Sequence, residues 1–270
     1  MTLPSPAYCD LASPYNVSAM NRFSLVVILL LATLTFSGCN NPPPKPIASP
    51  SPSPSPSPPP SPSPPSAEAV AEAARYRQQG LQHRQQGRMD EAIVALQKAV
   101  ELDPQSLSGH VLLGWTQHLT GEEDAAAAAL KQALALDETH VPALNALGIV
   151  YLVDGQLQAA VKTHHRAAEL KPDNEIAYYN LSLAYQRLGD DPQAVATAEK
   201  ATELEPGNPH PWVALAIAHW GTNPEAAKQA YRQALQLDGR YREAGFLAHL
   251  EQAGFSPEQI QLTDAIRNAL

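Results

Sequence analysis

The feature that most constrains this chain is a residue pattern that recurs every 34 residues through its C-terminal two thirds. In the unit that spans residues 141–174, apolar and small residues recur at helical spacing before and after the pair Asp154-Gly155, which interrupts the pattern. Gly148 and Ala160 have almost no side chain, so two helix backbones can approach closely at those points. Each unit is therefore predicted to form two short amphipathic helices joined by a turn.

Five consecutive units follow this pattern, four of 34 residues and a fifth of 33. They span residues 73–106, 107–140, 141–174, 175–208 and 209–241. The pattern over Ala73–Tyr241 resembles that of the tetratricopeptide (TPR) repeat family. The resemblance implies an all-α fold, namely a right-handed α-solenoid (superhelix) of about five TPR helix pairs. It also implies that residues 67–241 form a TPR domain.

Several residues depart from the family pattern, and we expect the local packing to differ where they do. Gln117, His83 and His219 stand where an aromatic residue is usual. Ala198 stands where a large residue would fill the second helix of the fourth unit. Its neighbours must fill that volume or leave a void that costs on the order of 1 kcal/mol or more.

Residues 242–270 are predicted to form C-terminal capping helices, which the open end of a solenoid needs. The pattern predicts that residues Glu243–Gln252 form another helix of the kind that begins each repeat unit. Ser256 and Gln259 then have the spacing of a capping box at the start of a new helix. That helix is expected to cover the core of the fifth unit with Ile260, Ala265, Ile266 and Leu270.

The N-terminal region has the pattern of a secretory signal that ends in a lipidation site. Arg22 precedes an apolar run of 14 residues, Phe23–Phe36, which is too short to span a bilayer. The residues that end at Cys39 resemble a bacterial lipobox, in which the cysteine receives a diacylglyceryl group and becomes the first residue. We expect residues 20–38 to be the signal peptide and Cys39 to be lipidated. An ordinary cleaved signal with an incidental cysteine is the alternative.

Two further N-terminal segments lack the residues to build a core. Residues 1–19 are polar and have no basic cluster, which favours Met20 as the true start and makes 1–19 a non-native or disordered extension. Residues 39–66 are a linker with 14 prolines, predicted to be disordered. In the polyproline II conformation this linker would be a spacer of roughly 75 Å. A proline-rich ligand for an aromatic groove is the alternative.

Charge and cysteine usage argue against several function classes. Residues 67–270 carry 16 Lys and Arg against 26 Asp and Glu, and such an acidic surface argues against nucleic-acid binding. Both cysteines, Cys9 and Cys39, precede the repeats, so the repeats have no disulfide or thiolate site. The sequence has no zinc-protease motif, phosphate-binding loop or serine elbow. We therefore expect no catalytic residue, no metal and no cofactor.

In TPR proteins the first helix of each unit lines the concave side of the superhelix, and we expect a partner to bind in this groove. The residues that their unit positions assign to it are mostly apolar. They are Val111, Trp115, Leu119, Asn145, Ile149, Leu152, Tyr179, Leu183, Arg187, Val213, Ile217 and Trp220. Contiguous exposed apolar residues commonly mark a binding site, and Trp and Tyr are favoured anchors. The alternative is that several of them are buried between units or under the C-terminal segment.

These features predict a protein-interaction scaffold or adaptor of the bacterial cell envelope, which binds a peptide or helical segment of a partner protein in its groove. It would be exported and attached to a membrane through its N-terminal lipid anchor, on the periplasmic or outer face. A chaperone-like carrier of exported clients is the alternative, and an envelope enzyme is the least favoured reading.

Overall fold

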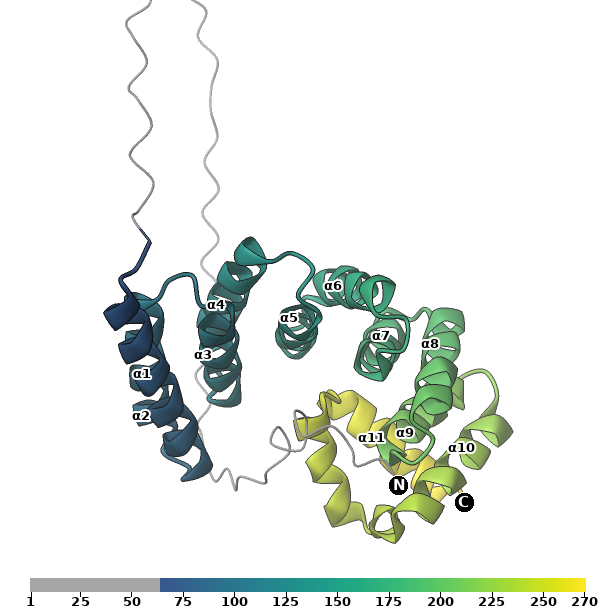
Figure 1. Ribbon diagram of the computed structural model, residues 1–270. Coiled ribbons are helices and arrows are strands. Elements are labelled where there is room, and N and C mark those ends of the chain that lie inside the picture. The colour runs from purple at the N-terminus through teal and green to yellow at the C-terminus, as the bar shows by residue number, and fades with distance from the viewer. Residues whose placement is uncertain (1–63) are drawn as a thin grey trace, which may run out of the picture. The chain divides into compact units, whose positions relative to one another are not determined.

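The computed structural model describes residues 64–270, and this part of the chain contains helices but no strands (Figure 1). The predictions for residues 1–19, for the signal peptide 20–38, for Cys39 and for almost all of the linker lie outside the described residues. Between residues 64 and 270, no helix combines the length and the hydrophobicity that crossing a bilayer requires.

Helices α1 to α10 form five consecutive pairs, one pair for each predicted unit. The first helices of the pairs are α1 (Ala67–Gln85), α3 (Leu107–Leu119), α5 (Val141–Val153), α7 (Glu175–Leu188) and α9 (Pro209–Trp220). The second helices are α2 (Met89–Leu102), α4 (Glu123–Leu136), α6 (Leu157–Leu170), α8 (Asp191–Leu204) and α10 (Pro224–Leu237).

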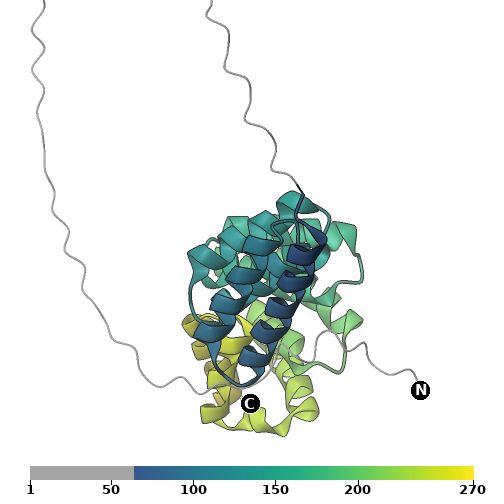
Figure 2. The same cartoon turned by 60° about the vertical axis from the view of Figure 1, so that its left-hand side comes forward.

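The pairs stack in chain order, as Figure 2 shows, so that each helix packs on its own partner and on the helix that follows. Successive first helices also contact one another, from α1 with α3 to α7 with α9. They do so because α3, α5, α7 and α9 lie on the inner side of the curve and the second helices on its outer side (Figure 1). The described residues therefore form an α-solenoid, which confirms the predicted fold class.

Four of the five pairs turn at a glycine in the left-handed conformation. Gly87, Gly121, Gly155 and Gly189 have φ angles of 75°, 78°, 78° and 74°, a region that residues with a side chain rarely adopt. The fifth pair differs, because Gly221 after α9 is right-handed with a φ of −75°. This turn is where the fifth unit has one residue fewer than the others.

One contact between the two helices recurs in the first three pairs: a glycine of the first helix lies against a large side chain of the second. The contacts are Gly80 with Leu96, Gly114 with Leu130, and Gly148 with His164. A Cβ atom added to these glycines would lie 2.6, 2.7 and 2.5 Å from the opposing side chain, closer than real Cβ atoms approach. The close approach predicted at Gly148 is therefore confirmed.

The fourth and fifth pairs fill the same two positions with other residues. In the fourth pair they are Ser182 and Ala198, which are both buried. The larger residue at the first position thus supplies part of the volume that Ala198 lacks at the second. In the fifth pair they are Ala216 and Tyr231, and the buried hydroxyl of Tyr231 donates a 2.8 Å hydrogen bond to the carbonyl oxygen of Tyr241.

The residues after α10 do not form another helix of the first type, so that expectation is wrong. They form the 3₁₀ turn η2 (Gly239–Arg242), the 3₁₀ helix η3 (Ala244–Ala253) and then α11 (Pro257–Asn268). In η3, Leu247 and Leu250 lie three residues apart and are both buried. Side chains three residues apart eclipse in a 3₁₀ helix and can share one buried stripe.

Helix α11 begins with the predicted capping box. The Ser256 hydroxyl accepts a hydrogen bond of 3.3 Å from the Gln259 backbone N–H, and the Gln259 side chain accepts one of 3.0 Å from the Ser256 N–H. The helix packs on α9 and α10, as expected of a cap. Ile260 and Ile266 join the core cluster, whereas Ala265 and Leu270 are exposed and do not cover it.

His164 makes the stability of this fold sensitive to acid. Its side chain is fully buried and neither ring nitrogen has a hydrogen-bond partner within residues 64–270, and this burial lowers its pKa from 6.5 to about 3. Between about pH 6 and pH 4 the unfolded chain therefore binds a proton that the folded chain does not bind. We expect the free energy of unfolding to fall there by about 1.4 kcal/mol per pH unit on account of this one residue.

The substitution His164→Leu, which restores the residue type of Leu96 and Leu130, should remove this part of the pH dependence and stabilise the protein. Urea unfolding at about pH 5 and about pH 7.5 measures the effect, which should be larger at the lower pH. The control His165→Gln removes an exposed neighbour that makes only a minor contribution to the lowered pKa of His164, so it should change the profile far less than His164→Leu does. An equal effect of His164→Leu at both pH values would contradict the assignment.

Candidate functional site

The residues assigned to the concave groove fall into two sets, because the chain's own C-terminal segment lies on part of that side (Figure 1). We call the inner residues of α3 and α5 that remain partly or fully exposed the open surface: Val111, Trp115, Leu119 and Ile149. We call the inner residues that share a core cluster with η3 and α11 the covered surface: Leu152, Tyr179, Leu183, Val213 and Ile217.

The covered surface is closed by the segment between η3 and α11. The hydroxyl of Tyr179 donates a hydrogen bond of 2.5 Å to the carbonyl oxygen of Ala253. The ring of Phe255, which is 3% exposed, lies 6.1 Å from the Tyr179 ring, centroid to centroid. A Cβ on Gly254 would be in van der Waals contact with Leu152 and Leu183, so the backbone of this segment itself touches the covered surface.

Gln259 ties the first turn of α11 to α7. Its side-chain amide donates hydrogen bonds of 3.1 Å to the carbonyl oxygen of Leu183 and 2.9 Å to the side-chain oxygen of Gln186. Since its own oxygen accepts from Ser256, one residue both caps α11 and docks it. The sequence pattern reveals the cap but carries no signal for the docking contact.

The expected groove, which runs from the second unit to the fifth, is therefore not open in its distal part, where the alternative of burial under the C-terminal segment holds. Leu152, Leu183 and Val213 have no exposed surface and Ile217 is 3% exposed, so these side chains cannot meet an external partner while the segment is docked. Trp220, at the end of α9, is partly buried against the same core cluster. The physical reason is that the apolar residues at this end of the array are buried by packing against the apolar residues of the chain's own C-terminal segment.

Two polar residues of the predicted groove hold neighbouring helices together instead of facing a ligand. Asn145 and Asn174 exchange amide hydrogen bonds of 3.1 and 2.9 Å, and Asn145 is 4% exposed. This pairing joins α5 to the residue that precedes α7. Arg187 donates a 2.5 Å hydrogen bond to the carbonyl oxygen of Leu152, at the C-terminal end of α5.

The open surface is apolar at its centre, and charges near it are paired. The Trp115 ring lies 5.0 Å from the His118 ring, and His118 Nδ1 lies 2.8 Å from a carboxylate oxygen of Glu123. On α1, the guanidinium of Arg77 lies 3.6 Å from the Asp103 carboxylate. Both of these basic side chains therefore already have an acidic neighbour.

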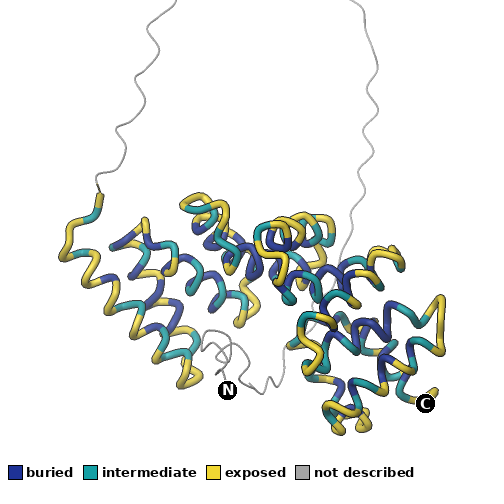
Figure 3. Tube along the Cα trace, turned by 45° about the vertical axis from the view of Figure 1, so that its right-hand side comes forward, coloured by how far each residue is buried: buried dark blue, intermediate teal, exposed yellow. Residues whose placement is uncertain are grey.

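Leu119 and Trp115 give the open surface its accessible hydrophobic area. Leu119, at the end of α3, is 44% exposed, although it is a large apolar side chain. The indole N–H of Trp115 is buried and has no hydrogen-bond acceptor among the described residues. Figure 3 shows that the first pair of helices is exposed over much of its length, so nothing in residues 64–270 covers this end of the array.

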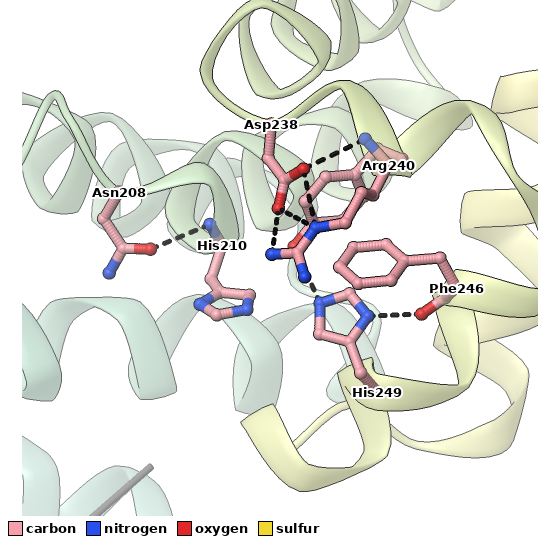
Figure 4. A network of polar contacts seen from close by, with 7 residues as sticks. Asn208, His210, Asp238, Arg240, Phe246 and His249 are labelled. Atoms are coloured by element: carbon pink, nitrogen blue, oxygen red, sulfur yellow. Dashed lines mark hydrogen bonds and ion pairs between the residues drawn. The ribbon is translucent and has the colours of Figure 1, made fainter. Parts of the chain in front are cut away.

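A cavity of about 530 Å³ lies beside the docked segment, between α9, η2 and η3 (Figure 4). Its walls include the rings of His210 and His249, whose centroids are 5.6 Å apart. His249 is held on both sides, since Nδ1 donates to the carbonyl oxygen of Phe246 and Nε2 lies 3.1 Å from the Tyr241 hydroxyl. Sequence reasoning missed His249, because an isolated histidine outside the repeats has no pattern that marks it.

Burial and the neighbouring charged groups together set the protonation of His210. The pKa of His210 is lowered from 6.5 to about 4: burial is the largest cause, the neighbouring His249 adds to it, and Asp238 opposes both effects. The Asp238 carboxylate is itself paired with the Arg240 guanidinium at 2.7 Å. His210 is therefore neutral at neutral pH while the segment is docked.

Within residues 64–270, no group of three or more His, Cys, Asp or Glu side chains is arranged to hold a metal ion. The cavity between His210 and His249 is included in this finding.

Acid should loosen the C-terminal segment. When the segment leaves α9, water reaches His210 and its pKa returns towards 6.5, so docking weakens as the pH falls from about 6.5 towards 4, by at most about tenfold per pH unit. Hydrogen exchange of the η3 amides, measured at several pH values and compared with the exchange of an unstructured peptide at each pH, should show that their protection decreases as the pH falls. The variant His210→Phe should flatten the dependence, and an equally steep dependence in that variant would contradict the role of His210.

Comparison with known proteins agrees with this architecture. A family model described as TPR repeat matches residues 80–121 and 153–189. A second model, described as tetratricopeptide repeat, matches residues 107–140 and 176–208. No protein with a curated description matches the chain in sequence.

Solved structures of similar fold include two MamA proteins and PilF. A MamA crystal structure is 28% identical, with a TM-score of 0.55, and the match covers 60% of this chain and 95% of MamA. Pseudomonas aeruginosa PilF is 24% identical (TM-score 0.58, 74% and 90% covered). MamA from Desulfovibrio magneticus RS-1 is 20% identical (TM-score 0.58, 62% and 96% covered); these last two matches concern the fold alone. Residues 64–270 of this chain thus form a solenoid that contains tetratricopeptide repeats.

Proposed function

We propose that this protein is a protein-interaction scaffold that binds a segment of a partner protein at the open surface. The observation that carries the proposal is the group of accessible apolar side chains on the inner side of α3 and α5, with Leu119 44% exposed. Repeat solenoids generally bind their partners along an extended inner surface. Accessible apolar patches on soluble domains commonly mark interaction sites.

The chemistry of the open surface favours an apolar segment as its ligand. Trp115 is partly exposed one helical turn from Leu119, and the nearby Arg77 guanidinium already pairs with the Asp103 carboxylate. A peptide or short helix that inserts an aliphatic or aromatic side chain fits this arrangement. An adaptor of this kind works by binding and does no chemistry of its own.

We expect the partner to be a protein of the cell envelope. The apolar run Phe23–Phe36 and the lipobox-like residues before Cys39 support export and a lipid anchor. Two or three acyl chains anchor a protein firmly, since each buried methylene contributes about 0.8 kcal/mol. The proline-rich residues 39–66 would then act as a spacer between the anchor and the repeats.

The open surface is tested by truncating Leu119. Crosslinking in intact cells followed by pull-down should recover a partner with the wild-type chain, and Leu119→Ala together with Trp115→Ala should reduce its recovery by at least tenfold. The reduction follows from the loss of the two main apolar contacts at the site. Recovery of one stable complex indicates an adaptor, whereas many unrelated clients indicate a chaperone-like carrier.

Leu136→Ala provides the matched control, because Leu136 is 43% exposed at the end of α4, a second helix on the outer side. This variant should recover the partner as the wild type does. Circular dichroism should give equal helicity for all variants. Loss of the partner in Leu136→Ala, or its retention in the double variant, would rule out the open surface.

The anchor is tested at Cys39. Mass spectrometry of the mature protein from a membrane fraction should find an acylated Cys39 as its first residue. The variant Cys39→Ala should leave the membrane fraction while its repeats remain folded, because the acyl chains can no longer be attached. An unmodified mature N-terminus at any other residue would refute the lipid anchor without affecting the open surface.

A further inference from the structure

We infer that the covered surface is a second segment-binding site, that the chain's own residues 243–270 are its resident ligand, and that a helical segment of the same chemistry from a partner protein exchanges with them. This site is distinct from the open surface and does not depend on it. Its ligand is defined by the contacts of the resident segment.

The resident segment is bound as a peptide ligand is bound, through one aromatic anchor and a few directed hydrogen bonds. Phe255 is the anchor, 3% exposed and packed on Tyr179. The hydrogen bonds are those from Tyr179 to the Ala253 carbonyl oxygen and from Gln259 to α7. All of them join residues at least 73 positions apart in the chain, so the site does not depend on local sequence to form.

The segment is organised as a separable unit. Glu243, which links it to η2, has an extended backbone with φ −94° and ψ 119°. The first turn of α11 is closed by its own capping box between Ser256 and Gln259, so this helix does not need the repeats to satisfy its first amides. Between them lies η3, a ten-residue 3₁₀ helix, which is much longer than such helices usually are because their hydrogen-bond geometry is poor.

The segment covers helices that also pack on one another, and its own side chains Leu247, Leu250 and Ile266 add to the core cluster at this end of the array. Helices α7 and α9 each pack on their own partners, α8 and α10, and on one another, as in the other pairs. What undocking would expose is an apolar surface that includes Leu183, Val213 and Ile217, which are at most 3% exposed in the docked state. Such a surface does not remain in contact with water, so exchange of one occupant for another is favoured over an empty site.

The contacts define the chemistry of the exchanging segment. It carries an aromatic residue in the place of Phe255, followed by a helix whose N-cap hydroxyl and third residue form a capping box, with Gln at that third position. An acidic residue just before this Gln is favoured, because Arg187 and Glu258 attract each other across the site. The resident sequence Phe-Ser-Pro-Glu-Gln, residues 255–259, is the reference for this motif.

The test uses a fluorescently labelled peptide with the sequence of residues 243–270 and the full chain as receptor. In the receptor Phe255→Ala/Gln259→Ala the resident segment is weakened while the covered surface is intact. The peptide should bind this receptor at least tenfold more tightly than the wild type, because it meets less competition. A peptide that carries the same two changes should bind neither receptor.

The matched control receptor is Leu270→Ala/Gln261→Ala, which also removes one large apolar side chain and one glutamine from the segment. Both residues are exposed, so this receptor should bind the peptide no more tightly than the wild type. Adding Tyr179→Phe to the weakened receptor removes the donor to residue 253 and should reduce peptide binding severalfold. No binding to the weakened receptor, with its helicity intact, would overturn the inference.

Hydrogen exchange of the wild-type chain decides the question if the weakened receptor does not fold. A resident ligand opens by itself, so the amides of residues 244–268 should exchange at least tenfold faster than those in α7 and α9. If they exchange only together with α9 and α10, the segment is a permanent cap of the array and the inference is wrong. Neither result bears on the Leu119 and Trp115 variants, so the two sites are tested separately.

Discussion

The structure depends on the close approach of two helix backbones within each pair. In the first three pairs a glycine of the first helix lies against a large residue of the second, and at Gly80, Gly114 and Gly148 there is no room for even a Cβ atom. Because this contact brings the pairs to similar spacing, successive pairs can stack with the same geometry. The inner side of the stack, and with it both binding surfaces, follows from that regularity.

Much of this fold can be predicted from the sequence, because its contacts are local and periodic. The helix pairs, their turns and the Gly148 contact all follow from a spacing of 34 residues. Position within a unit is a weaker guide to what a side chain does. Asn145 and Arg187 have the unit positions of groove residues, yet the structure uses them to join α5 to α7 and to the residue that precedes it.

The location of the C-terminal segment could not be predicted in the same way. Its contacts with α7, such as that between Gln259 and Leu183, join residues more than 70 positions apart. They occur once, so the repeat pattern contains no signal for them. The sequence reveals that the segment has a capped helix and apolar residues that must be buried. Whether these cover the end of the array or its inner side depends on the curvature, which only the assembled solenoid provides.

The two ends of the array differ in how firmly they are held. The last pair is clamped by η2, η3 and α11, whereas α1 buries only Ala73 and Gly80. In a linear stack each pair is stabilised only by its neighbours, so unravelling starts at α1 and proceeds towards the clamped end. The molecule thus has a mechanical polarity: tension applied through the residues that precede α1 would peel off the weakest pair first, while the pairs near the C-terminus keep their shape.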